Sequence, residues 1–135
     1  AFIPIISGMS GNSGTQSLAV SVRNITTGEI NEQSKFRIAL REAGSGVLSG
    51  VVCSTILFTI IVAIYHQPLL ALIVAGSLTC AMTVGTFVGS MIPLLMNKLN
   101  IDPAVASGPF ITTINDIISM LIYFGLATSF MAYLI

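Results

Sequence analysis

Long runs of apolar residues constrain the fold of this chain more than any other feature. The two clearest runs span residues 69–96 and 104–135. Each exceeds the roughly 20 mostly apolar residues that a helix needs to cross the hydrocarbon core of a bilayer. Only 7% of the 135 residues are charged, against about 25% in soluble domains. The chain is therefore predicted to be a single all-α domain, residues 1–135, built as a polytopic transmembrane helix bundle.

Two further segments complete a predicted bundle of four spans. One segment, residues 37–65, is apolar after its charged first turns. The other, residues 1–25, is interrupted by a polar run at residues 7–16. Asp102 is expected to cap the last helix, and Pro103 is expected to open it. The four spans are predicted to be approximately residues 1–25, 37–65, 69–97 and 104–135.

The positive charges predict how the chain sits in the membrane. All five Lys and Arg residues flank the connections that follow the first and third spans: Arg23, Lys35, Arg37, Arg41 and Lys98. In a chain of four spans these connections lie on one side, which the positive-inside rule makes the cytoplasm. The carboxyl terminus and the connection that contains His66 then lie outside a plasma or inner membrane. A net charge of zero gives no support for a nucleic-acid partner.

Four acidic residues lie near the predicted membrane surface. Glu42 closely follows Arg37 and Arg41, so we predict a surface ion pair, with a position at the mouth of a pore as the alternative. The other three are expected in cytoplasmic loops, either solvated or in contact with a cytosolic gating domain: Glu29, Glu32 and Asp102.

Pairs of glycines four residues apart predict close helix packing. Gly46 and Gly50 form one such pair, and Gly85 and Gly89 form another. These small-xxx-small patterns let helix backbones approach closely in lipid. They indicate packing within the chain or, alternatively, the seam of a homodimer. A four-span bundle has little room for an interior aqueous path, which favours a homodimer with a pore at its twofold axis.

Catalytic motifs are absent from the sequence. It contains neither a His-Glu-x-x-His zinc pair nor a Gly-x-Ser-x-Gly elbow. An intramembrane aspartyl protease needs two aspartates that share a proton, and Asp116 is the only Asp within a predicted span. Cys53 and Cys80 lie far apart in apolar segments, which favours buried thiols over a disulfide or a metal pair. We therefore predict that the chain is not an enzyme.

Asp116 is the residue that any function must explain, because it lies well inside the last apolar segment. A carboxylate at membrane depth costs at least about 2.5–3.5 kcal/mol, so it normally faces a bundle interior, a water-filled cavity or an ion. Cation binding is the leading interpretation. One alternative is a proton relay, although no second acid or histidine lies far from the ends of a span. Another is a structural carboxyl group that is hydrogen-bonded to Asn12, Thr15 or Gln16.

Polar residues around Asp116 form a predicted stripe. Gly108, Thr112 and Asp116 follow one another at intervals of four, so one face of a helix carries them all. Pro109 is expected to leave the carbonyl of Val105 without its helical donor. A carboxylate with nearby carbonyl oxygens suits a hard cation such as magnesium, which keeps several of its waters. One carboxylate per chain is too little for a dehydrated divalent site, so two Asp116 side chains are expected across a twofold axis.

The polar run of the first segment is the second candidate region. Residues 8–16 contain three glycines and several hydroxyl or amide side chains. The run is either a tightly packed polar helix face or the lining of a pore or ion site, where an opened backbone lets carbonyls face the ion. It is not a P-loop, since no Gly-Lys-Ser/Thr follows. The candidate residues that shape the cavity or offer oxygens are Gly11, Asn12 and Thr15.

Two longer motifs stand at opposite ends of the chain, with compatible spacing between them. The first is Pro4-x-x-x-Gly8-x-x-Gly11-Asn12-x-Gly14-x-Gln16, with Val22-Arg23 and Thr27-Gly28-Glu29 beyond it. The second is Leu99-x-x-Asp102-Pro103-Ala104-x-Ala106-Ser107-Gly108-Pro109-x-x-Thr112-Thr113-x-x-Asp116, continued by Leu121-Ile122-Tyr123-Phe124-Gly125. Together they resemble the transmembrane domain of MgtE-type magnesium transporters.

The resemblance implies a homodimeric, magnesium-selective channel with its pore between the subunits. The family's transmembrane domain has five helices, of which this chain would hold the second to the fifth, without the first helix and the cytosolic magnesium-sensing domains. The family's ion-binding aspartate matches Asp116, which would bind hydrated magnesium. Backbone carbonyls near Gly11 and Thr112 match other parts of that site. Some family members have Asn where Thr15 and Gly108 stand here.

We therefore expect the chain to move hydrated magnesium through the lipid bilayer as a homodimer, with a cytosolic regulatory domain as a further partner in a longer chain. Mg²⁺ is the expected transported ion. Two alternatives are a magnesium exchanger coupled to sodium or protons, and a membrane partner subunit that does not transport. The expected metal site consists of Asp116, Thr112, Gly108, Gly11, Asn12 and Thr15.

Overall fold

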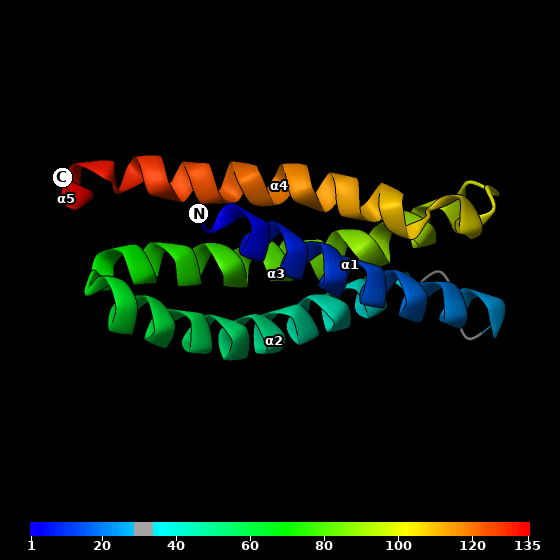
Figure 1. The fold of residues 1–135 in the computed structure, drawn as a ribbon. Helices are drawn as coiled ribbons and strands as arrows, with labels where there is room; N and C mark the ends of the chain where they lie inside the picture. Colours follow the sequence, from blue (N-terminus) through cyan, green and yellow to red (C-terminus); the bar gives the residue numbers. More distant parts are fainter. Residues whose placement is uncertain (29–33) are drawn as a thin grey trace.

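The chain folds as a bundle of long helices (Figure 1). The computed structural model describes residues 1–28 and 34–135, so the expectations for Glu29 and Glu32 lie outside the described residues. No strand occurs in these two ranges, which confirms the all-α helix bundle. The elements are α1 (Ile3–Thr26), α2 (Ser34–Tyr65), α3 (Pro68–Lys98), the 3-10 turn η1 (Pro103–Val105), α4 (Gly108–Ser129) and α5 (Met131–Leu134).

Helix α3 is the centre of the bundle. It packs closely against each of the other long helices, whereas α1 and α2 meet mainly through side chains, such as Ser17 with Glu42. Its neighbours bury one apolar cluster with it: Ile6, Leu57, Ile61, Ala71, Val74, Leu78, Ala81 and Met82. A smaller cluster joins Leu18, Ala106 and Ile111 toward the opposite end. Helices α1 and α4 also contact each other directly, so the two pack side by side on α3.

Glycines allow α3 to approach its neighbours closely. A Cβ atom on Gly46 of α2 would lie 2.2 Å from Thr86 Oγ1, and one on Gly89 would lie 2.2 Å from the carbonyl oxygen of Gly14 on α1. Gly50 similarly faces Thr79 of α3. Both glycine pairs therefore act inside a single chain, which confirms packing within the chain over a seam between two copies at these positions.

Three helices of the described chain are long and apolar enough to cross a membrane, namely α2, α3 and α4. Helix α1 has 24 residues but is less apolar, because its polar run lies inside the helix. The count of four spans stays a prediction. The run of residues 8–16 is continuous α-helix, so the expectation of an opened backbone there is wrong.

The start of the last long helix differs from the predicted residue 104. Asp102 accepts a hydrogen bond from the backbone N–H of Ala104 at 3.0 Å, but it caps only η1. Helix α4 begins at Gly108, after Ser107 Oγ accepts from the N–H of Phe110 at 3.4 Å. Pro109 explains why α4 does not begin at residue 104. In a helix that began there, Pro109 would lack an N–H donor and clash with the preceding turn, whereas the first turn of a helix tolerates proline.

Two further details of the last segment differ from the prediction. Pro109 was predicted to leave the carbonyl of Val105 without a donor. This prediction is wrong, because the Val105 carbonyl accepts a hydrogen bond from the N–H of Ser107 at 2.8 Å. At its far end α4 stops at Ser129 and the chain turns into α5, so residues 104–135 are not one continuous helix.

The helix ends place the positive charges together. The end of α1, the start of α2 and the end of α3 all lie at one end of the bundle, where α4 also begins (Figure 1). These segments carry all five basic residues: Arg23, Lys35, Arg37, Arg41 and Lys98. We call this the basic end of the bundle.

Candidate functional site

Helices α1 and α4 face each other in an antiparallel register. Ser7 Oγ donates a hydrogen bond to Asp116 Oδ1 at 2.5 Å. A Cβ atom on Gly11 would lie 3.1 Å from Thr112 Cγ2, and one on Gly108 would lie 3.7 Å from Thr15 Cγ2. Steps of four residues on one helix thus match steps of four in the opposite direction on the other. We call this set the α1–α4 seam: Ser7, Gly11, Thr15, Gly108, Thr112 and Asp116.

The structure brings together five of the six residues that the sequence singled out. Gly11 and Thr15 face Gly108 and Thr112 across the seam, with Asp116 one turn further on. Asn12 is the exception. It is exposed, and its side chain makes no hydrogen bond in the described part of the chain.

The partner of Asp116 differs from the three that were expected. Asn12 and Gln16 are exposed, and the Thr15 hydroxyl is hydrogen-bonded elsewhere. Ser7 takes their place because the register sets it opposite Asp116. Only Oδ1 receives a hydrogen bond within the described residues, and the carboxylate is half-buried. Its second oxygen therefore keeps its full capacity to accept from water or to bind a cation.

The threonine hydroxyls of the seam bond back to their own helices. Thr15 Oγ1 donates to the carbonyl of Gly11 at 3.1 Å and to that of Asn12 at 2.9 Å. Thr112 Oγ1 donates to the carbonyl of Gly108 at 2.9 Å. The methyl groups of both threonines face the opposite glycines instead. The strongest cation ligand on the seam is therefore the Asp116 carboxylate.

A buried amide lies directly behind the seam, and sequence reasoning gave it no role. Asn115 has no exposed surface. Its Nδ2 donates to the carbonyl of Ser10 on α1 at 3.3 Å and to that of Gly85 on α3 at 3.5 Å. Ser10 Oγ donates in turn to the carbonyl of Ala81 at 2.8 Å. These contacts join α1, α3 and α4 behind Asp116. The sequence feature that could have indicated this role is an Asn inside an apolar segment.

The Gly14 position leaves the space that this amide occupies. A Cβ atom there would lie 2.0 Å from Asn115 Nδ2 and 3.1 Å from the carbonyl oxygen of Gly85. Any larger residue at position 14 would displace the amide or push the helices apart. Gly14 of the polar run thus serves helix packing on one face, while Gly11 on the next face meets Thr112 and Gly8 meets nothing within 4 Å.

Glu42 is the second acid that contacts α1. Ser17 Oγ donates to Glu42 Oε2 at 2.6 Å, and Ser17 is buried. Across the described residues, Glu42 forms no ion pair with Arg37 or Arg41. The predicted surface ion pair is therefore wrong, because Glu42 points toward α1 rather than along its own helix.

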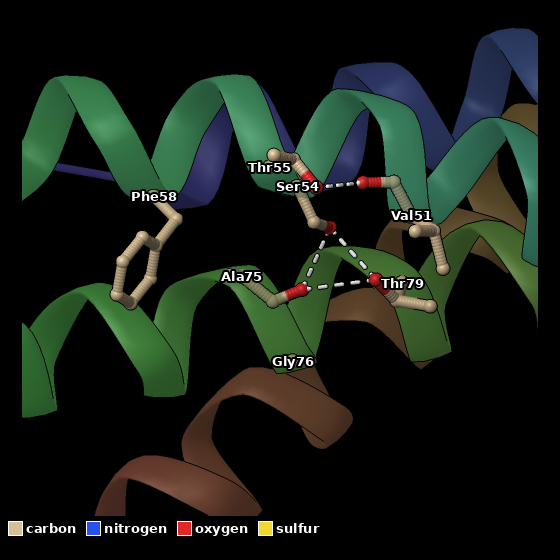
Figure 2. Close-up of a pocket in the computed structure, with 7 residues that line it drawn as sticks. All are labelled: Val51, Ser54, Thr55, Phe58, Ala75, Gly76 and Thr79. Carbon is tan, nitrogen blue, oxygen red and sulfur yellow. Dashed lines mark hydrogen bonds between the residues drawn. The ribbon is translucent and has the colours of Figure 1, made fainter.

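A cavity of about 270 Å³ between α2 and α3 is lined by hydroxyls but by no charged group (Figure 2). Ser54 Oγ lies 2.8 Å from the carbonyl oxygen of Ala75 and 2.7 Å from Thr79 Oγ1. Thr55 Oγ1 donates to the carbonyl of Val51 at 2.8 Å. Because these hydroxyls are paired and no carboxylate is present, the cavity offers a cation little.

The described residues contain no group of three or more His, Cys, Asp or Glu side chains that could hold a metal ion. Cys53 and Cys80 are free thiols. Cys53 is partly buried, but Cys80 is exposed on α3, so the expectation of a buried thiol is wrong there. A divalent ion on one chain would therefore meet a single carboxylate on the α1–α4 seam and would take its other ligands from water.

Comparisons with known proteins point to one group. The model of the MgtE family, described as a divalent cation transporter, matches residues 3–126. The chain is 46% identical over 129 residues to the magnesium transporter MgtE of Bacillus subtilis strain 168, covering 96% of this chain and 29% of that protein. It is 42% identical over 134 residues to that of Enterococcus faecalis, with 99% and 30% covered.

A third relative is more distant. The magnesium transporter MgtE of Thermus thermophilus is 33% identical over 128 residues, with 93% of this chain and 28% of that protein covered. The chain spans less than a third of the length of each of these relatives.

Proposed function

This chain belongs to the MgtE family of divalent cation transporters, and we propose that its α1–α4 seam lines a path for hydrated Mg²⁺ across the membrane. The observation that carries the proposal is the half-buried Asp116 carboxylate, aligned with Ser7 on the seam. Asp116 supplies the negative charge. The path is passive, and the chain has no catalytic role.

A second copy of the chain completes the site in this proposal. One Asp116 per seam neutralises half the charge of a divalent ion, and two of them across a twofold axis neutralise all of it. At low effective dielectric constant, two carboxylates attract a divalent cation far more strongly than in water. The path then lies between the two subunits of a homodimer.

The surface next to the seam supports this arrangement. Gly8, Asn12 and Gln16 follow one another at intervals of four on α1, and all three are exposed. Pro109 and Thr113 are exposed beside them on α4. Polar groups at membrane depth normally face other protein or water, not lipid. A water-filled path covered by a second copy satisfies this requirement.

Hydrated magnesium fits the chemistry of the seam better than a dehydrated ion. Magnesium demands octahedral coordination and gives up its waters reluctantly. The hydroxyls of Thr15 and Thr112 are turned toward backbone carbonyls of their own helices. Few direct ligands are therefore offered, and the carboxylates act on the water shell of the ion. Discrimination between cations then depends on the size of the hydrated ion.

The positive charges give the proposed orientation of the chain in the membrane. The basic end of the bundle carries all five positive charges, and the positive-inside rule places it in the cytoplasm. In the four-span arrangement the carboxyl terminus then lies outside. The accessibility of single introduced cysteines at the two ends, measured in intact cells, tests this orientation.

Magnesium uptake into liposomes tests the function. The chain is reconstituted as wild type, as Asp116→Asn and as the control Asp102→Asn, which removes one negative charge outside the seam and keeps a capping side chain. With a magnesium gradient alone, wild type and the control take up magnesium and Asp116→Asn does not. Equal uptake by Asp116→Asn contradicts the proposed path.

Two other results identify the alternatives. Uptake that requires an added sodium or proton gradient shows an exchanger instead of a passive path. No uptake by folded wild type under either gradient indicates a partner subunit that does not transport.

A further inference from the structure

A second cavity lies at the basic end of the bundle, away from the α1–α4 seam. It measures about 190 Å³ and lies between the start of α2 and the last two turns of α3. Its lining combines two lysines with four apolar side chains: Lys35, Phe36, Met91, Leu94, Leu95 and Lys98. We call it the α2–α3 groove.

The α3 wall of the groove changes from apolar to basic along its length. Met91, Leu94, Leu95 and Lys98 are spaced as i, i+3, i+4 and i+7, so they form one stripe on the helix. At 1.5 Å per residue, the stripe rises about 10 Å from Met91 to Lys98. Its apolar part lies toward the middle of the helix, and its lysine is the last residue of α3.

The groove opens on the outside of the bundle. Phe36 is 59% exposed and Leu95 is 48% exposed, while Leu94 closes the floor at 2%. Among the residues that the structure describes, no Asp or Glu lines the groove. In a membrane-spanning bundle this outer surface meets lipid, and its lysines stand at the end of the span, at the level of the headgroups.

We propose that the α2–α3 groove binds one anionic phospholipid. The phosphate lies between the ammonium groups of Lys35 and Lys98, and an acyl chain lies along Met91 and Leu95. The order of chemistry along the groove, basic at the end and apolar toward the middle, matches the order along a phospholipid. Basic pockets between transmembrane helices bind anionic headgroups in this manner.

A soluble anion fits the groove less well. It could contact the lysines, but it would leave the exposed faces of Phe36 and Leu95 uncovered. Lysines at helix ends also reach toward the interface without binding a particular lipid. That ordinary behaviour predicts no preference between lipids of equal chain length, and this difference makes the proposal testable.

Native mass spectrometry of the purified full chain in detergent measures the binding. The protein is titrated with phosphatidylglycerol and, separately, with phosphatidylcholine of the same acyl chains. Wild type is compared with the double variant Lys35→Gln/Lys98→Gln. The matched control is Arg23→Gln/Arg37→Gln, which removes two positive charges from the same end but none from the groove.

The expected result is retention of one phosphatidylglycerol by wild type and by the arginine control. The lysine variant should bind it about 10-fold more weakly. Phosphatidylcholine should bind weakly to all three proteins. Equal retention of both lipids by wild type, or an equal loss of binding in both double variants, overturns the proposal in favour of general attraction to the basic end.

A variant that fills the groove tests the apolar part of the groove separately from its two lysines. Leu95→Trp places a large side chain in the apolar part and keeps both lysines. The proposal expects this variant to lose phosphatidylglycerol while its thermal unfolding in detergent stays unchanged. Retention of the lipid by a folded Leu95→Trp protein contradicts the proposed position of the acyl chain.

Discussion

The α1–α4 seam and the contact between α2 and α3 use the same kinds of residue to different ends. On α2 and α3, Gly46 and Gly50 allow close approach, and Ser54 pairs with Thr79 and the Ala75 carbonyl. On the seam, Gly11 and Gly108 face threonines in a similar way, but a half-buried carboxylate stands beside them. Glycines and hydroxyls therefore indicate close packing in both regions, and the carboxylate distinguishes the seam from the α2–α3 contact.

Exposure sharpens the difference between the two regions. The surface beside the seam is polar, with Gly8, Asn12 and Gln16 exposed. The outer face of α2 is apolar instead, with Val51, Val52 and Ile56 at least half exposed. The α2 face suits lipid. The seam face requires protein or water against it, which is the physical basis of the proposed homodimer.

The largest effect on stability is expected where α1 meets α3. A Cβ atom on Gly89 would lie 2.2 Å from the backbone oxygen of Gly14, whereas one on Gly76 of the same helix meets nothing within 4 Å. Gly89→Ala should lower the free energy of unfolding by about 1–3 kcal/mol, as overpacking does. Gly76→Ala should not lower it. Unfolding in detergent measures both variants, and equal stability contradicts the close approach.

The buried amide behind the seam should have the next largest effect. Asn115→Leu removes the donor to the carbonyls of Ser10 and Gly85. The loss should cost about 0.5–1.5 kcal/mol of stability, the net contribution of such hydrogen bonds. Because Asn115 positions the helix that carries Asp116, magnesium uptake should fall as well. If Asn115→Leu is as stable as wild type and takes up magnesium normally, Asn115 does not position Asp116.

A matched pair of serine substitutions compares the two regions directly. Ser54→Ala removes hydrogen bonds at α2–α3, and Ser7→Ala removes the donor to Asp116. Each should cost about 0.6 kcal/mol of stability, the average for such bonds between transmembrane helices. Only Ser7→Ala should change the magnesium concentration that gives half-maximal uptake. A similar change in Ser54→Ala would show that uptake responds to stability alone.

The smallest effect is expected at Thr112. Its hydroxyl bonds to the Gly108 carbonyl of its own helix, and its methyl group faces Gly11. Thr112→Val keeps the methyl contact, so uptake should stay within about a factor of two, equivalent to less than 0.5 kcal/mol. A large loss of uptake would mean that the hydroxyl itself contacts the ion or its water.

The periodicity of the chain predicted much of this arrangement. Apolar runs predicted the all-α bundle, and intervals of four placed Gly108, Thr112 and Asp116 on one face of α4. Of the two interpretations of the small-xxx-small pairs, packing within the chain is the one found at these glycines. These features depend on residues a few positions apart on one helix, which a single sequence displays directly.

Features that depend on two helices could not be predicted in the same way. Ser7 meets Asp116 because of the register between α1 and α4, and many registers fit the same apolar pattern. Glu42 points to Ser17 of another helix instead of to its sequence neighbours. The late start of α4 could not be predicted because Pro103 and Pro109 both suit the first turn of a helix, and Pro103 begins only η1.

Mixing subunits tests the central claim, that two Asp116 side chains from two copies act on one ion. Wild type and Asp116→Asn chains are combined in known proportions under conditions that let subunits exchange, and magnesium uptake into liposomes is measured. Uptake should follow the square of the wild-type fraction, so an equal mixture should retain about a quarter of the wild-type rate. Uptake proportional to the wild-type fraction would contradict the account, because each chain would then conduct with its own single carboxylate.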